Sequence, residues 1–160
     1  MFDKIRPLYL PWITFPEPES EWKKAILENI LESDIVIEVG SNRGGSTFLL
    51  TSKAKFVFGF EPGKSNFNIL RAFARHAKLT NLKIENIAIG DTEGEAEFFL
   101  SDDRGGYRNS MTPATGGKIE RVRINSLDNL SLNPKPTVLL MDCEGAETSI
   151  LGHLLEPYTL

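Results

Sequence analysis

Apolar residues in the first two thirds of the chain form short continuous runs that alternate with segments of helical periodicity. The runs at 35–39 and 56–60 predict buried strands, and a third strand is predicted over 83–89. A helix is predicted over 47–54, and another after residue 60, where Phe67 and further apolar residues recur at helical spacing. Apolar strands that alternate with helices indicate a parallel sheet covered by helices on both faces.

The pattern changes to strict alternation at 95–100 and again at 121–124. A period of two is typical of strands with one face in water, so these segments predict an inserted antiparallel hairpin. Antiparallel pairing would place Glu95 and Glu97 opposite Arg121 and Arg123. We favour these cross-strand ion pairs over an anion site at the two arginines. The connecting segment 102–117 is long and rich in glycine, which is typical of a functional or a mobile loop.

The remaining segments complete one α/β domain of 160 residues. Residues 137–141 predict a further buried strand, and a helix is predicted over 145–155. Residues 1–33 form a proline-rich segment followed by a helix that Ser20 caps. The α/β core is expected over 34–160.

Composition and charge exclude several classes of protein. Hydrophobic residues make up 41% of the chain and the net charge is -4, without a block of like charge that would indicate a nucleic-acid partner. No apolar run approaches the ~20 residues of a membrane helix, and the N-terminus does not resemble a signal peptide. We therefore expect a cytoplasmic protein. The single cysteine, Cys143, ends an apolar strand and is interpreted as a packing residue rather than a nucleophile.

A glycine-rich turn follows the strand at 35–39, just before a helix begins. Such a turn lets a ligand approach the backbone. The spacing of Gly40, Asn42 and Gly44 differs from the G-x-G-x-x-G of a nicotinamide site, and Glu38 precedes the first glycine. A sulfonium cofactor suits this arrangement, because its amino-acid ammonium and ribose hydroxyls require carboxylate and carbonyl partners.

Acidic residues follow two other predicted strands. Glu61 lies 21 residues after Gly40, where a carboxylate can accept hydrogen bonds from both hydroxyls of a ribose. A solvated turn residue before Pro62 is the alternative. Asp142 ends the strand at 137–141, where ligands bind in such sheets. The acids that follow it are also explained by the preference of carboxylates for helix N-termini.

Together these motifs resemble the FkbM-type methyltransferases. The resemblance rests on Glu-x-Gly-x-Asn-x-Gly from residue 38, Phe-Glu-Pro at 60–62, Ala-x-Gly-Asp at 88–91 and Asp-x-Glu-Gly-x-Glu at 142–147, and it extends from about residue 34 to 151. It implies a class I methyltransferase fold, S-adenosyl-L-methionine as cofactor, and methylation of a hydroxyl on a sugar or other small natural product. The cofactor residues that it implies are Glu38, Gly40, Ser41, Asn42 and Gly44 for the methionine part, Glu61 for the ribose, and Asn86, Ile87 and Ala88 along the adenine.

Two features depart from the family pattern. Glu38 and Ser41 stand where aspartate and alanine are more frequent, and both replacements keep the chemical character. The family also continues with three further strands, one of them beside the strand that ends at Asp142. We therefore expect a truncated chain in which this strand is an open edge, or a homodimer that pairs through that edge.

The catalytic assignment starts from Asp142 as base or substrate anchor, with Glu144 or Glu147 orienting it. A second group, from the long loop, is placed near the acceptor: Tyr107, Asn109 and Ser110. The alternatives are a flexible connection for the loop and a magnesium site for the acidic cluster, although no metal is assigned.

Two other functions stay open at this point. One is a nicotinamide-dependent oxidoreductase, which Glu61 allows and the glycine spacing disfavours. The other is a non-catalytic remnant that binds the cofactor or a partner. The sequence does not identify the acceptor.

Overall fold

The computed structural model describes residues 6–7, 24–26, 28–100, 118–143 and 146–155. Its main sheet has five strands in the order β1-β8-β2-β3-β4, and all neighbouring strands run parallel. The strands are β1 (Arg6–Pro7), β2 (Ile35–Val39), β3 (Phe56–Phe60), β4 (Leu82–Glu85) and β8 (Val138–Met141). The predicted α/β fold with a parallel sheet is confirmed, and the predicted bounds of β2 and β3 agree with the structure.

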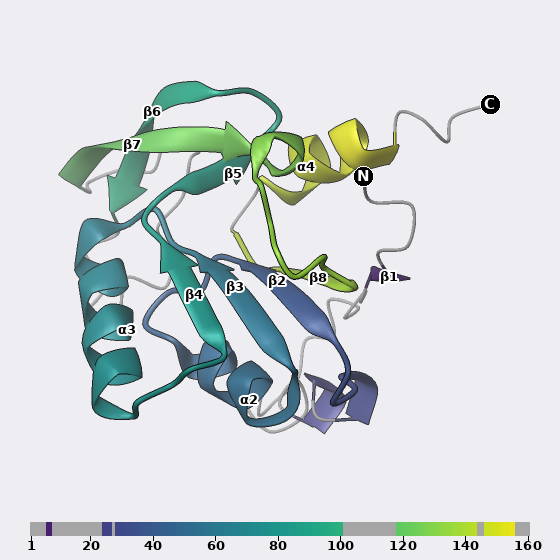
Figure 1. The fold of residues 1–160 in the computed structure, drawn as a ribbon. Helices are drawn as coiled ribbons and strands as arrows, with labels where there is room; N and C mark the ends of the chain where they lie inside the picture. Colours follow the sequence, from purple (N-terminus) through teal and green to yellow (C-terminus); the bar gives the residue numbers. More distant parts are fainter. Residues whose placement is uncertain (1–5, 8–23, 27, 101–117, 144–145, 156–160) are drawn as a thin grey trace.

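Helices cover both faces of this sheet (Figure 1). On one face Val36, Val57 and Val138 pack against Leu50 of α2 (Gly45–Lys53) and against Ile26, in the helical residues that precede the sheet. The opposite face carries a second cluster of buried side chains from the same strands and from α4 (Glu147–Leu155): Ile35, Ile37, Phe58, Phe60, Leu139 and Ile150. Because neighbouring residues of a strand point to opposite faces, one continuous apolar run serves both layers.

Helix α3 (Lys64–His76) lies beside α2, and the rings of Phe73 and Phe48 meet edge to face at 6.1 Å. Its inward stripe consists of Phe67 and Leu70, which are buried. The helix ends at His76, and Ala77, which follows it at the helical spacing of Phe67 and Leu70, is exposed. Among the described residues, no helix has the length and apolar character needed to cross a membrane.

A second sheet of three strands lies beyond the arrowheads of β3 and β4 (Figure 1). It consists of β5 (Ala88–Gly90), β6 (Gly94–Leu100) and β7 (Lys118–Ser126), in the order β5-β7-β6. The predicted antiparallel hairpin is β6 and β7, with Glu95 opposite Arg123 and Glu97 opposite Arg121. The ion pair that forms is diagonal and loose, between Arg121 and Glu95 at 4.0 Å. Within the described residues, Arg123 has no ion-pair partner.

The third predicted strand, over 83–89, is wrong as a single strand. Residues 82–85 belong to the main sheet as β4, whereas 88–90 belong to the second sheet as β5, parallel to β7. The break falls at Asn86, whose side-chain amide donates hydrogen bonds to the carbonyls of Glu61 (2.9 Å) and Pro62 (2.7 Å). These bonds hold the chain to the turn after β3, and it leaves the main sheet there.

The expected open edge at β8 is partly paired. Arg6 and Pro7 of β1 run parallel to β8, in register with Val138 and Leu139. Because β1 has two residues, it pairs with only the first part of β8, yet it lies where the missing neighbouring strand was expected.

A buried acid fastens the amino ends of β2 and β8. The carboxylate of Asp34 accepts a hydrogen bond from the Leu31 amide (2.8 Å) through Oδ2 and one from the Thr137 hydroxyl (3.0 Å) through Oδ1. The hydroxyl oxygen of Thr137 in turn accepts a bond from the Ile35 amide at 3.0 Å. The Thr137 side chain therefore connects two strands that are about 100 residues apart in sequence.

We predict that Thr137→Val, which keeps the shape and removes the hydroxyl, lowers the free energy of unfolding by about 1–3 kcal/mol, because a buried carboxylate loses a donor and the Ile35 amide loses its acceptor. Urea unfolding monitored by circular dichroism measures this difference. Thr148→Val is the matched control, since Thr148 lies exposed on α4. Equal stability of the two variants would contradict the assigned role of Thr137.

Candidate functional site

The carboxyl ends of β2, β3 and β8 are joined by hydrogen bonds between the turns that follow them. The amides of Gly40 and Ser41 both donate to the carbonyl of Phe60, at 2.9 and 3.1 Å. The Asp142 amide donates to the carbonyl of Val39 at 3.0 Å. Three predicted site segments therefore meet at the carboxyl ends of the strands, although about 100 residues separate the first from the last in sequence.

Gly40 makes this junction possible because it has no side chain. Its φ is +89°, and a Cβ placed on it would lie 2.0 Å from the carbonyl oxygen of Asp142. Gly44, with φ +98°, similarly leaves room for Leu70, whose Cδ1 would lie 2.6 Å from an added Cβ. The predicted glycine-rich turn is therefore a close approach of the backbone to its neighbours, and its residues 40–44 are buried or half-buried.

Glu38 lies under this turn and is buried. Its Oε2 accepts a short hydrogen bond from the Thr47 hydroxyl at 2.6 Å, whereas its Oε1 has no hydrogen-bond partner within the described residues. Burial raises the pKa of the Glu38 carboxyl above its ordinary value, and the charge of Asp142 adds to this shift. Hydroxyls close to the carboxylate act in the opposite direction, and among them Thr47 donates the hydrogen bond described above.

Two further buried polar atoms, both in the glycine turn, have no hydrogen-bond partner in the described part of the chain. They are Oγ of Ser41 and Oδ1 of Asn42. A buried polar atom without a partner costs free energy, so a site that leaves three of them open is suited to a polar ligand. A carboxylate, a hydroxyl and an amide oxygen can each accept a hydrogen bond, and an ammonium group can donate to all three.

Glu61 ends β3 and is buried, with 4% of its surface exposed. Its two carboxylate oxygens accept hydrogen bonds from the backbone amides of Asn42 (2.9 Å) and Gly63 (2.8 Å). Glu61 therefore fastens the glycine turn, in which Asn42 has a φ of +49°. Burial, together with the charge of Glu38, raises the pKa of Glu61 to about 7 although the two amide bonds act in the opposite direction.

The predicted adenine segment lies directly beside Glu61. Asn86 is half-buried and uses its side-chain amide for the two carbonyls of the β3 turn, which leaves its Oδ1 as an acceptor. Ile87 and Ala88 have buried side chains in two different core clusters. A ligand at this segment would meet the backbone of these two residues rather than their side chains.

Asp142 has an exposed side chain at the end of β8. Partial desolvation by the surrounding protein raises the pKa of Asp142 above its ordinary value, and the charge of Glu147 adds to this shift. The carboxylate is therefore a better proton acceptor near neutral pH. Glu147 accepts a hydrogen bond from the Cys143 amide at 2.8 Å and so shapes the turn that carries Asp142. Burial raises the pKa of the Cys143 thiol, and the residue packs against the core, which agrees with its predicted packing role.

Four predicted site residues lie outside the described residues: Glu144, Tyr107, Asn109 and Ser110. Among the residues that are described, no group of three His, Cys, Asp or Glu side chains is placed to hold a metal ion.

Sequence reasoning missed three residues that support the site. Thr47 binds Glu38, and Asn66, which is 3% exposed, helps to hold the pKa of Glu61 down. Gly59 leaves room for Ser41, whose Oγ would lie 2.7 Å from a Cβ on Gly59. Two signals in the sequence could have identified these residues: polar residues on the inward side of a helix, and a glycine inside an apolar strand.

Comparisons with known proteins agree with this geometry. The family model of the methyltransferase FkbM domain matches residues 38–158. The hexuronic acid methyltransferase AglP of Haloferax volcanii is 26% identical over 133 residues, which are 83% of this chain and 55% of that protein. The crystal structure of methyltransferase FkbM from Methylobacillus flagellatus covers 78% of this chain with a TM-score of 0.55 and 19% identity, and the match spans 30% of that chain.

The structural likeness confirms the methyltransferase-type α/β fold, and this chain spans about half the length of the Haloferax relative. The family model includes every described site residue from Glu38 to Glu147. Because it covers well over half of the chain, this chain belongs to the methyltransferase FkbM domain family.

Proposed function

We propose that this chain binds S-adenosyl-L-methionine at the ends of β2 and β3 and transfers its methyl group to an oxygen of a sugar or sugar acid. The observation that carries the proposal is the pair of buried carboxylates, Glu38 and Glu61, on either side of the Gly40 turn. Burial, and to a lesser extent the charge of Glu38, makes the ionised form of Glu61 costly, and a cationic ligand would offset that cost. S-adenosyl-L-methionine carries an ammonium and a sulfonium, and the sulfonium supplies an electrophilic methyl group.

The open acceptors beside the glycine turn would hold the amino-acid end of the cofactor. Oε1 of Glu38 and Oδ1 of Asn42 are acceptors, and the Ser41 hydroxyl can donate or accept. Gly40 and Gly44 let the turn lie against Asp142 and Leu70, which holds these acceptors in place.

Glu61 would accept hydrogen bonds from the two ribose hydroxyls while it holds the Gly40 turn through the Asn42 amide. A carboxylate has about four lone-pair sites, and the amides of Asn42 and Gly63 occupy two of them. Asn86 would offer Oδ1 to the amino group of the adenine, and the backbone of Ile87 and Ala88 would lie along the ring. NAD sites also use an acid to bind the ribose hydroxyls, but the family match favours a methyltransferase over an oxidoreductase.

Asp142 would accept the proton of the attacking hydroxyl. Its side chain is exposed at the same sheet edge, and its raised pKa brings it closer to neutral pH, where a general base works best. Glu147 positions the turn through the Cys143 amide. Glu144 remains our proposal for orienting Asp142, and Tyr107, Asn109 and Ser110 of the long loop remain our proposals for the acceptor side.

The class of acceptor rests on the relative, which is named for hexuronic acid. A sugar of this kind presents several hydroxyls and one carboxylate, and positioning one oxygen in line with the methyl group is the main requirement of the transfer.

Our first prediction here concerns the cofactor. Titration calorimetry should show binding of S-adenosyl-L-methionine and none of NAD, and Glu61→Ala should weaken the former about 100-fold or more, because two hydrogen bonds to a charged group are lost. Glu85→Ala, an acid at the end of the neighbouring strand β4, is the matched control and should bind normally. Equal binding by both variants would exclude Glu61 from the site.

A second prediction separates binding from turnover. Asp142→Asn should bind S-adenosyl-L-methionine as the unchanged chain does, yet lose about 100-fold or more in methyl transfer, because it lacks the base. The readout is release of S-adenosylhomocysteine with D-glucuronate as acceptor. Absence of transfer by the unchanged chain despite cofactor binding would favour a non-catalytic remnant.

A third prediction concerns pH. The folded-state pKa of Glu61 is about 7, above the ordinary value of 4.5, so the folded chain holds this proton more tightly than the unfolded chain. Stability should therefore fall as pH rises from 4.5 through 7, by up to about 3 kcal/mol from this group. Urea unfolding at pH 5 and pH 8 measures the loss. Glu61→Gln should lose correspondingly less, and an identical loss in the variant would contradict the shift.

A further inference from the structure

A short hydrogen bond joins the first turn of α2 to the acid that lies under the glycine turn. The Thr47 hydroxyl donates to Oε2 of Glu38 at 2.6 Å, and both side chains are buried. This distance lies in the range of about 2.5–2.7 Å that is typical of a hydroxyl donating to an ionised carboxylate. The bond therefore favours the charged form of Glu38 in a place where burial disfavours it.

The packing of α2 does not require this hydroxyl. The inward side of the helix also carries Leu50, which packs against the main sheet, and Thr51, one turn further on. The Thr51 hydroxyl donates to the carbonyl of Phe48 within the same helix at 3.0 Å, as threonines in helices commonly do. The Thr47 hydroxyl instead reaches across to β2. A valine at position 47 would fill the same volume, so the hydroxyl acts on Glu38 rather than on the packing.

The hydrogen bond makes the two oxygens of the Glu38 carboxylate unequal. Oε2 is occupied by Thr47, whereas Oε1 has no partner within the described residues. Two more open polar atoms, in Ser41 and Asn42, belong to the turn that follows β2. Without the Thr47 bond, the carboxylate could rotate about its last side-chain torsion, which has a broad two-fold profile. Thr47 therefore fixes the orientation in which one oxygen stays free for a ligand.

The charged groups that act on Glu38 are acidic. Asp142 at the end of β8 and Glu61 at the end of β3 both interact electrostatically with it. Within the described part of the chain, no cationic side chain forms an ion pair with Glu38, and Arg43 of the glycine turn donates to Asn66 instead. Hydroxyl donors are therefore the groups that support a negative charge on Glu38 before a cation binds.

We propose that Thr47 is a positioning residue of the cofactor site: its hydroxyl holds Oε2 of Glu38, so that Oε1 meets the ammonium of S-adenosyl-L-methionine. Thr47 does not touch the cofactor and acts through Glu38. The inference rests on the proposed function and deepens it, because it adds a helix residue that controls the charge and the orientation of the ammonium ligand. A neutral or rotated Glu38 would attract the ammonium less.

The test is titration calorimetry of the full chain with S-adenosyl-L-methionine between pH 6 and pH 8. Thr47→Val keeps the shape of the side chain and should weaken binding about tenfold or more at pH 6, because a hydrogen bond to a charged group is lost. The loss should shrink as the pH rises, because the pKa of Glu38 is higher without this donor and the carboxyl then ionises over a higher range of pH. Thr47→Ser keeps the hydroxyl and should bind nearly as the unchanged chain does.

Thr51→Val is the matched control, because it removes the other buried hydroxyl of α2 and leaves Glu38 untouched. It should bind the cofactor normally at every pH. Equal binding by Thr47→Val and Thr51→Val would overturn the proposal. A loss in Thr47→Val that is the same at every pH, or that Thr47→Ser shares, would show a role in packing alone and would also overturn it.

Carbon nuclear magnetic resonance of the Glu38 carboxyl, in the absence of cofactor, separates the two proposals. The titration midpoint of this group should lie at a higher pH in Thr47→Val than in the unchanged chain, and Thr51→Val should not move it. Cofactor binding by the unchanged chain, with an unmoved midpoint in Thr47→Val, would contradict the Thr47 inference alone. Absence of cofactor binding by the unchanged chain, with the midpoint moved in Thr47→Val, would contradict the proposed function instead.

Discussion

The close contact between Gly40 and the carbonyl of Asp142 is the constraint on which the site depends. Because Gly40 has no Cβ, the turns after β2 and β8 can approach within hydrogen-bond distance of each other. The Phe60 carbonyl, which accepts from the amides of Gly40 and Ser41, joins the β2 turn to the end of β3. This junction places Glu38, Glu61 and Asp142 at one sheet edge. Burial raises the pKa of both Glu38 and Glu61, repulsion from Glu38 adds to the shift at Glu61, and repulsion from Asp142 adds to the shift at Glu38. A cationic cofactor is the ligand that such a set of acids would favour.

Much of the fold follows from the apolar pattern because the main sheet is buried on both faces. The bounds of β2 and β3 were predictable since every residue in those runs is apolar or small apart from Glu38. The division of 83–89 was not, because Ile84, Ile87 and Ile89 are equally apolar and only a tertiary contact of Asn86 separates the two strands. The pairing of β1 could not be predicted either, since two residues carry no periodicity.

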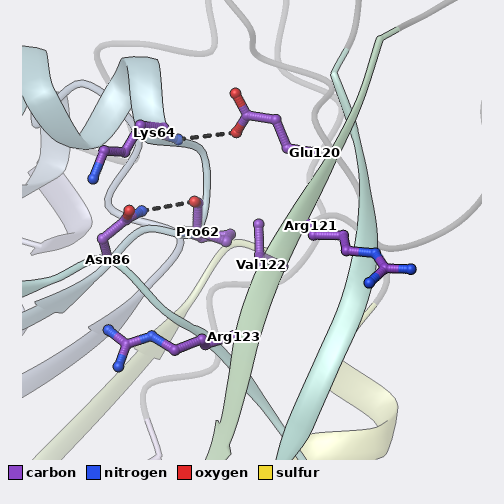
Figure 2. A pocket seen from close by; sticks show the side chains of 7 residues that line it. All are labelled: Pro62, Lys64, Asn86, Glu120, Arg121, Val122 and Arg123. Atoms are coloured by element: carbon purple, nitrogen blue, oxygen red, sulfur yellow. Dashed lines mark hydrogen bonds between the residues drawn. The ribbon is translucent and has the colours of Figure 1, made fainter.

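The site was predictable where backbone geometry demands particular residue types, as at Gly40, and where an acid ends a strand, as at Glu61. Its supporting residues were not, because the inward direction of Thr47 and Asn66 depends on how α2 and α3 are rotated against the sheet. Cross-strand reasoning gave the correct register for the hairpin. It did not distinguish Arg121, which reaches Glu95 diagonally, from Arg123, which extends below Asn86 (Figure 2).

The most direct test of the central claim is a crystal structure of this chain with S-adenosylhomocysteine. The account predicts the ribose hydroxyls within hydrogen-bond distance of the Glu61 carboxylate and the ammonium beside Glu38 and Asn42, with the Gly40 turn in contact with the methionine part. A product molecule bound elsewhere, or bound here without contact to Glu61, would contradict the account.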